Sequence, residues 1–178
     1  MTMAAAVWPI DVQRTLRVNQ SGEFGAIGIY QAQRLLAPIF WRDGRALLDE
    51  MLAHEREHLR IFTTLLRSRG IRSCYAIGLW RLGGWALGAV TSLFGRQGIL
   101  ACTESVESTV LAHLADQKHR IGARDPELIA AIESIEAQER EHRDHGTEAA
   151  ASASLPLRMV RALSRGATEL AIALSMRL

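Results

Sequence analysis

Cysteine, proline and lysine are all scarce in this 178-residue sequence, and each scarcity limits which structures and functions are possible. Two cysteines, Cys74 and Cys102, can make neither a disulfide framework nor a cysteine zinc site. Any metal chemistry must therefore use the six histidines and the carboxylates. Lys118 is the only lysine, and the net charge of +2 supplies no strong positive field, so nucleic-acid binding would require a local basic patch. We expect no nucleic-acid partner.

Strand-like alternation and long apolar runs are also missing. The four prolines and the lack of period-2 patterning predict an all-α protein, and the length predicts a single domain over residues 1–178. The N-terminal residues 1–9 carry no basic residue before their apolar stretch, which is typical of neither a signal peptide nor an Arg-rich transit peptide. We therefore expect a protein on the cytoplasmic side of the cell membrane.

Turn-forming residues divide the chain into six expected helices. Pro38–Gly44 and Gly122–Pro126 are the expected turns of two helical hairpins, over about 11–69 and 97–146. Asp125 is the expected N-cap of the fifth helix, with a proline at its first position. The expected helices span about residues 11–36, 45–69, 74–94, 97–121, 126–145 and 155–178.

An internal repeat links the two hairpins at an offset of 84 residues. The Glu-Arg-Glu-His segment at 55–58 recurs at 139–142, and the same offset places Glu23 on Glu107. Composition alone predicts about half a Glu–Glu match at one offset, whereas three occur with a His–His match beside them. Each hairpin therefore carries a Glu on its first helix and a Glu-x-x-His pair on its second.

The repeat predicts a metal site inside a four-helix bundle. Glu and His three residues apart share one helical face, and in each hairpin the first-helix Glu lies level with that pair because both helices rise about 1.5 Å per residue. Four carboxylates and two imidazoles are the ligand set of ferritin-like di-iron carboxylate bundles. Without a metal, these groups would be costly to bury. The predicted ligands are Glu23, Glu55, His58, Glu107, Glu139 and His142.

The other acidic and histidine residues around the motifs are not predicted to be metal ligands. Glu57 and Glu141 lie on the far side of their helices from the motif histidines, which indicates solvated side chains. Histidines 54, 119 and 145 match no histidine at the repeat offset and are expected at the surface. His113 follows Glu107 by six residues and is expected either beside the ligands or in the core.

The expected third helix is strongly apolar. Its uncharged stretch, residues 82–94, is 13 residues long and too short to span a bilayer. Gly84 and Gly88 form a GxxxG pattern, a weak signal in so short a segment. The C-terminal helix is amphipathic and basic, so both helices either lie in a membrane interface or pack on the bundle or in a homo-oligomer. Trp80 and Trp85 at the rim of the third helix favour the membrane.

Several segments together resemble the demethoxyubiquinone hydroxylases of ubiquinone biosynthesis. They are residues 17–26 (RVNQSGEFGA) with 29–30 and Gln33, residues 102–103 with 106–107, residues 125–126, residues 139–142 (EREH) with Asp144 and Gly146, and residues 174–178 (LSMRL). The resemblance covers about residues 14–178. It implies that Glu55 and Glu139 bridge two irons, whereas Glu23 and Glu107 are terminal ligands. The chain departs from the usual pattern at Gln20 and Ser21, where many members have His and Ala. It also has Ala-His-Leu at 112–114, where members often have His-His-Tyr.

The resemblance implies that O₂ hydroxylates the ring of a polyprenyl demethoxyubiquinol. The cofactors would be two Fe ions per chain, with a reductant, NADH, supplied from outside because no dinucleotide-binding fingerprint is present. The membrane surface and other quinone-biosynthesis proteins are the implied partners. A ferritin- or rubrerythrin-like oxidase or peroxidase, a di-iron tRNA hydroxylase and a non-enzymatic bundle remain as alternatives. The expected ring pocket comprises residues near the ligands: Ala26, Ile27, Tyr30, Phe62, Val110, Leu111 and Leu114.

Overall fold

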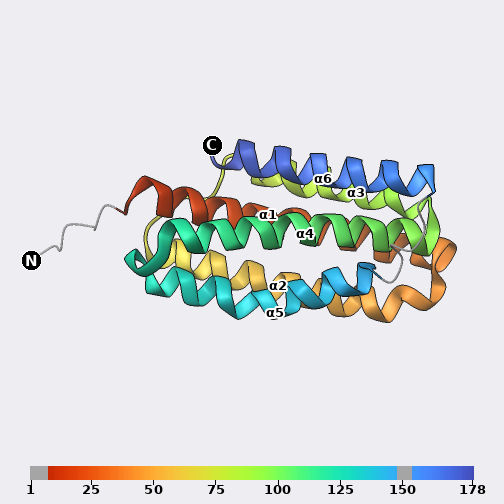
Figure 1. Cartoon of the computed structure of the whole chain (residues 1–178), viewed down its shortest axis with the longest axis horizontal. Coiled ribbons are helices and arrows are strands. Elements are labelled where there is room, and N and C mark those ends of the chain that lie inside the picture. The colour runs from red at the N-terminus through yellow and green to blue at the C-terminus, as the bar shows by residue number, and fades with distance from the viewer. Residues whose placement is uncertain (1–7, 148–153) are drawn as a thin grey trace, which may run out of the picture.

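The described chain is entirely helical apart from its turns, as the sequence predicts (Figure 1). The structure is a computed structural model that describes residues 8–147 and 154–178. Within these ranges there are six α-helices, with short 3-10 turns at Arg42–Gly44 and Gly122–Arg124. The helices are α1 (Ile10–Phe40), α2 (Arg45–Ser68), α3 (Ile77–Ser92), α4 (Gly95–Ile121), α5 (Pro126–Thr147) and α6 (Leu155–Ser175).

Two helix boundaries differ clearly from the prediction. Helix α1 continues through Pro38 to Phe40, whereas we expected its end at Leu36. Proline costs a helix one backbone hydrogen bond and a steric clash, but here it lies in the last turn, which the Trp41 N–H closes by donating to Ala37 O over 2.8 Å. Helix α3 begins at Ile77 rather than at Cys74, because the chain first makes a turn in which Ile77 N–H donates to Cys74 O.

Four helices form a bundle and two cover one side of it. Helix α1 packs on α2, and α4 packs on α5. Helix α3 lies along α1 and α6 lies along α4, so these two form an outer layer on the side away from α2 and α5 (Figure 1). The outer layer therefore covers only the half of the bundle that α1 and α4 contribute.

Buried apolar side chains form three clusters in the described chain, two of them inside the four-helix bundle and the third between α1, α4 and α6. Leu16, Phe62, Leu114 and Ile132 belong to one of the two bundle clusters. Tyr30, Leu48, Met51 and Ile99 belong to the other. On α1, α2 and α4 the predicted metal ligands fall between residues of these two clusters in sequence, so the band of carboxylates and imidazoles has apolar packing on both sides. On α5 only the first cluster contributes, before Glu139. Burial of such clusters is the main driving force of folding, and here it also removes water from around the band.

Glycines bring α1 and α3 into unusually close contact. A Cβ atom on Gly84 would overlap the carbonyl oxygen of Gly25, and one on Gly88 would overlap that of Ile29. On the opposite helix, a Cβ on Gly28 would overlap the carbonyl oxygen of Arg81. Small residues permit helix backbones to approach in this way. The GxxxG pattern therefore serves the α1–α3 contact within this chain.

The turn before α5 has the structure that the sequence predicts. Leu128 N–H donates to Asp125 Oδ1 over 3.0 Å, so Asp125 caps the helix. The same carboxylate accepts two hydrogen bonds from the Arg69 guanidinium, of 2.5 and 2.9 Å. Both side chains are almost fully buried, and this pair joins the end of α2 to the start of α5.

Candidate metal centre

The six predicted ligands converge in the middle of the bundle, and all are buried. Two groups could each hold a metal ion, with the ligand atoms of each group within 4.8 Å of one another. One group comprises Glu23, Glu55, His58 and Glu139, and the other comprises Glu55, Glu107, Glu139 and His142. Glu55 and Glu139 belong to both groups, which is the arrangement that two metal ions with two shared carboxylates require.

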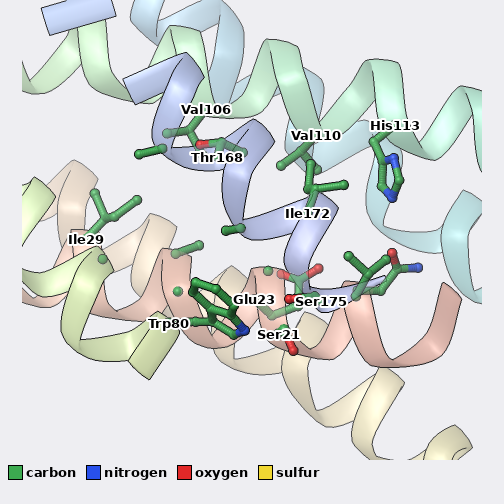
Figure 2. A pocket seen from close by; sticks show the side chains of 18 of the residues that line it. Ser21, Glu23, Ile29, Trp80, Val106, Val110, His113, Thr168, Ile172 and Ser175 are labelled. Carbon is green, nitrogen blue, oxygen red and sulfur yellow. The ribbon is translucent and has the colours of Figure 1, made fainter. Parts of the chain in front are cut away.

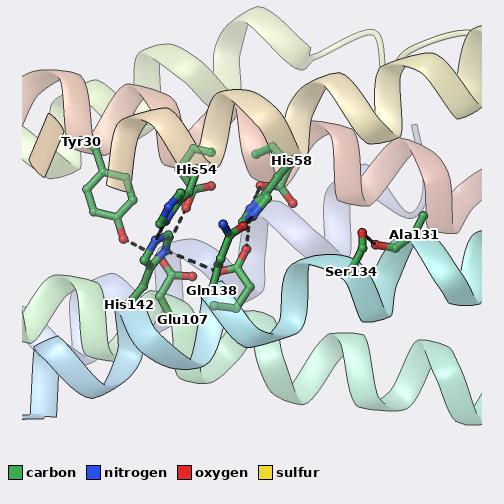
Figure 3. Close-up of polar contacts among 11 residues, drawn as sticks. Tyr30, His54, His58, Glu107, Ala131, Ser134, Gln138 and His142 are labelled. Atoms are coloured by element: carbon green, nitrogen blue, oxygen red, sulfur yellow. Dashed lines mark hydrogen bonds and ion pairs between the residues drawn. The ribbon is translucent and has the colours of Figure 1, made fainter. Parts of the chain in front are cut away.

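The two imidazoles present equivalent atoms to the carboxylates. His58 Nδ1 lies 3.0 Å from Glu139 Oε1 and 3.6 Å from Glu23 Oε2. His142 Nδ1 lies 3.3 Å from Glu55 Oε1. On the other side of each ring, His58 Nε2 is 2.8 Å from Gln138 Oε1, and His142 Nε2 is 3.0 Å from His54 Nδ1 (Figure 3). With Nε2 as the donor in both bonds, each Nδ1 keeps a lone pair facing the carboxylates.

His54 and Gln138 are 84 residues apart, so the repeat also relates the two groups that orient the imidazoles. We expected His54 at the surface, and that prediction is wrong. The side chain is half-buried, and its ring stacks on that of His142 with centroids 5.2 Å apart. The repeat conceals this role because its two copies carry different residue types at this position, although a histidine nitrogen and an amide oxygen accept the same hydrogen bond.

Glu57, Glu141 and the remaining histidines are exposed or half-buried. Glu57 and Glu141 are exposed, which agrees with solvated side chains. His119 is exposed, and His145 is half-exposed, 3.9 Å from Glu141. His113 is half-buried, its Nε2 contacts no hydrogen-bond partner in the described chain, and burial lowers the pKa of its imidazole. A neutral His113 side chain follows from that environment.

Electrostatics show how poorly these ligands suit a site without a cation. Burial raises the pKa of the Glu23 and Glu55 carboxyls, and burial beside Glu139 raises that of Glu107 well above its usual value. Burial alone would lower the pKa of the His58 imidazole, but attraction to Glu139 and Glu23 outweighs it and raises the value to about 12. Protons thus supply the positive charge that the carboxylates need.

The donor atoms at the centre of the band fit divalent metal ions. Among the atoms that have no hydrogen-bond partner in the described parts of the chain, four belong to the predicted ligands: Glu55 Oε1, Glu139 Oε2, His58 Nδ1 and His142 Nδ1. Buried polar atoms are normally hydrogen-bonded, so unpaired atoms that face a common point indicate a missing partner. Carboxylate oxygens with imidazole nitrogens suit metals such as iron, and a metal replaces the protons that they otherwise hold.

A cavity of about 270 Å³ opens beside the carboxylates (Figure 2). Glu23, Glu55, Glu107 and Glu139 contribute to its wall. The cavity extends outward from them between α1, α4 and the outer helices. Its apolar lining from the outer layer includes Leu87 of α3 and Ile172 of α6. It thus joins the candidate metal centre to the side of the bundle that α3 and α6 cover.

Three of the seven expected pocket residues line this cavity, namely Ala26, Val110 and Leu114. Ile27 and Tyr30 lie in the apolar cluster on one side of the carboxylates, and Phe62 lies in the cluster on the other side. Leu111 is half-buried outside the lining. The contribution of α6 was not expected. Its signal in the sequence is the series of small residues Ala167, Ala171 and Ser175, which face the cavity at four-residue spacing.

Sequence comparisons place the chain beside enzymes of one pathway. The family described as ubiquinone biosynthesis protein COQ7 matches residues 11–175. A 3-demethoxyubiquinol 3-hydroxylase from Rhodospirillum rubrum is 38% identical over 76% of this chain and 63% of its own length. The NADPH-dependent 3-demethoxyubiquinone 3-hydroxylase of human mitochondria is 32% identical over 94% of this chain and 78% of its own. The chain thus spans just under two thirds of the bacterial relative.

Proposed function

The chain belongs to the COQ7 family of ubiquinone biosynthesis proteins, and on that premise we propose that it hydroxylates the ring of a polyprenyl demethoxyubiquinol with O₂. One oxygen atom enters a ring C–H bond to give a hydroxyl group. The other leaves as water, with two electrons and two protons from a reductant. The observation that carries the proposal is that two candidate metal groups share Glu55 and Glu139 and open on a mainly apolar cavity.

We propose that Glu23, Glu55, His58 and Glu139 hold one iron, and that Glu55, Glu107, Glu139 and His142 hold the second. Two ferrous ions bound there would supply the electrons and the Lewis acidity for reductive activation of O₂. The chain's own residues provide the conditions for that chemistry. Four carboxylates nearly neutralise two divalent cations, Gln138 and His54 fix the imidazole rings, and the apolar clusters keep water away from the reactive site.

The substrate assignment rests on the shape and the lining of the cavity. Apolar side chains from α1, α3, α4 and α6 form most of its wall, with the carboxylates at one place in it. A quinol ring is flat, largely apolar and edged with oxygen atoms. Binding sites for small molecules of this kind are mostly apolar, with a few placed polar groups. An iron-storage or peroxide-reducing bundle would use the same ligands without needing so large an apolar cavity.

The long isoprenoid tail of the substrate favours work at a membrane surface. Within the described residues, no helix combines the length and the hydropathy that crossing a bilayer requires. Helices α3 and α6 nevertheless expose large apolar side chains: Leu79, Leu82, Trp85, Val90, Met159, Leu163 and Leu170. Exposed arginines 158 and 165 accompany them on α6. Apolar helices with flanking basic residues bind anionic membrane interfaces, so we propose peripheral attachment on the cytoplasmic side.

The electrons must come from another molecule, and we propose NADH as their source, delivered directly or through a reductase partner. The curated human relative is named as dependent on NADPH, a donor of the same class. A homo-oligomer and contacts with other proteins of quinone biosynthesis are compatible with the outer apolar face.

The test uses the intact chain in a bacterial strain that lacks its own demethoxyubiquinol hydroxylase. We expect the wild-type chain to restore ubiquinone and to remove accumulated demethoxyubiquinone, as measured by mass spectrometry of lipid extracts. Glu55→Gln should restore nothing, because it removes a shared ligand. Glu57→Gln, at an exposed position on the same helix, is the matched control and should behave like wild type. If neither the wild-type chain nor Glu57→Gln restores ubiquinone, although both are present in soluble form, the proposed activity is refuted.

A further inference from the structure

Besides the carboxylates of Glu55 and Glu139, three buried polar atoms in the wall of the cavity have no hydrogen-bond partner in the described chain. They are Ser21 Oγ, Trp80 Nε1 and His113 Nε2. The other uncharged polar groups include Asn19, which pairs with Gln117, and Thr168, which donates to Ser164 O. Buried hydroxyls without a partner also occur elsewhere in the described chain, at Thr15, Thr103 and Ser164, but none of those residues lines the cavity.

Ser21, Glu23 and Trp80 all line the cavity. Ser21 precedes Gly25 by one helical turn, so both face α3. The carbonyl oxygen of Trp80 lies 3.6 Å from the position that a Cβ on Gly25 would take. Figure 2 shows the indole nitrogen of Trp80 directed to the side of the cavity where Ser21 and Glu23 lie, with His113 well apart from them. The contact between α1 and α3 therefore brings Trp80 to the same cavity wall as Ser21 and Glu23.

The chemistry of these two groups limits what can bind them. An indole N–H only donates a hydrogen bond, whereas a hydroxyl both donates and accepts. A buried indole N–H normally has an acceptor, and Ser21 is 97% buried, with 3% of its surface exposed. An oxygen atom on the edge of an otherwise apolar ring satisfies both groups.

We propose that the Trp80 indole N–H and the Ser21 hydroxyl bind an oxygen substituent of the quinol ring and so orient the ring beside Glu23. This inference rests on the proposed function, since it assumes a quinol in the cavity. Trp80 and Ser21 act as positioning residues, because they determine which ring edge faces the metal centre without taking part in the oxidation. Neither belonged to the expected ring pocket.

The test compares the affinity of the protein for two ligands, measured by isothermal titration calorimetry on metal-free protein. The first is a demethoxyquinone with a short prenyl tail, and the second is the same molecule with both ring oxygens replaced by hydrogen. We expect Trp80→Phe and Ser21→Ala each to weaken binding of the quinone about three- to tenfold, the effect of losing one neutral hydrogen bond. Binding of the deoxygenated ring should change less than twofold.

Two control variants match these substitutions. Ser105→Ala removes the hydroxyl at the repeat-equivalent position, which lies outside the cavity lining, and Trp85→Phe alters an indole on the exposed side of α3. Both should bind the quinone like wild type. In iron-loaded protein, Ser21→Ala should raise KM for the quinol by a similar factor with little loss of kcat. Near-ultraviolet circular dichroism checks that each variant is folded.

Three results would overturn the proposal. Unchanged quinone affinity in Trp80→Phe and Ser21→Ala would mean that their polar groups bind water or nothing. Equal losses for the quinone and the deoxygenated ring would mean that the two side chains only shape the cavity. Wild-type protein that binds neither ligand would remove the quinol from the cavity and so refute the proposed function as well, whereas the first two results leave that function intact.

Discussion

The Tyr30 hydroxyl donates a 2.6 Å hydrogen bond to Glu107 Oε1, and the repeat has no counterpart to this bond. The position equivalent to Tyr30 in the second hairpin is Leu114, which lines the cavity. Burial, with the charge of Glu107 nearby, raises the pKa of the phenol well above its usual value, so the hydroxyl keeps its proton. The two candidate metal positions are therefore inequivalent, although their ligands are related by the repeat.

Tyr30→Phe tests this asymmetry. A hydrogen bond to an ionised carboxylate is worth about 1.5–3 kcal/mol, so its loss should weaken metal binding at the position that includes Glu107 about tenfold or more. The other position should be unaffected. Anaerobic titration with Co²⁺, followed by visible absorption, resolves the two binding steps. Tyr75→Phe alters an exposed phenol and is the control. If both steps shift together in Tyr30→Phe, the hydrogen bond does not distinguish the positions.

His54 provides a second test of the repeat. His54→Ala removes the acceptor for His142 Nε2, and loss of such an orienting partner typically costs 10- to 100-fold in metal affinity, as an order of magnitude. His54→Gln should recover most of that loss, because Gln138 performs the equivalent role for His58 over 2.8 Å. Competition with a chromogenic chelator measures the affinity, and the exposed His119→Ala serves as a control. Equal affinities in the Ala and Gln variants would contradict the orienting role.

The two copies of the repeat also show which parts of the candidate site can be predicted from a sequence. The convergence of the six proposed ligands in one buried group was predictable because Glu-x-x-His is a local pattern on one helical face, and because the repeat supplies a second copy of it. His54 was missed because the same role falls to a different residue type in the other copy. The outer wall of the cavity was missed because it depends on how α3 and α6 pack against α1 and α4. That packing requires Gly25 and Gly84 to meet, and no local pattern fixes such a pairing.

Gly84→Ala should disturb the contact between α1 and α3. The added methyl group would overlap the Gly25 carbonyl oxygen, and overpacking of this kind costs about 1–3 kcal/mol. We expect a lower midpoint in urea denaturation and a raised KM for a short-chain quinol, since Trp80 on α3 would shift. Gly78→Ala lies in the same helix with nothing within 4 Å of the new Cβ, so its stability should stay the same or rise. Equal stability of the two variants would argue against a tight contact.

Vesicle binding tests the outer apolar face. Leu82 and Leu163 are 65% and 51% exposed, on α3 and α6. Burying a leucine contributes about 1.5–3 kcal/mol, so Leu82→Asp combined with Leu163→Asp should reduce binding to anionic phospholipid vesicles at least about tenfold in flotation assays. Ser134→Asp adds a charge to α5, on the opposite side of the bundle (Figure 1), and should bind nearly as wild type does. Wild-type-like flotation of the double variant would exclude this face as the membrane contact.

The buried pair of Arg69 and Asp125 gives a stability prediction that is independent of the metal centre. Removing one partner of such a pair leaves an uncompensated buried charge and costs about 3–5 kcal/mol. Asp125→Ala also removes the cap of α5, which the Leu128 N–H bond of 3.0 Å provides. Glu127→Ala is the matched control, because Glu127 contacts the same guanidinium over 2.8 Å but is 70% exposed, and exposed ion pairs contribute about 1 kcal/mol or less. Urea denaturation of metal-free protein should therefore separate the two variants by several kcal/mol. A similar small loss in both would mean that Arg69 reaches solvent when its partner is removed.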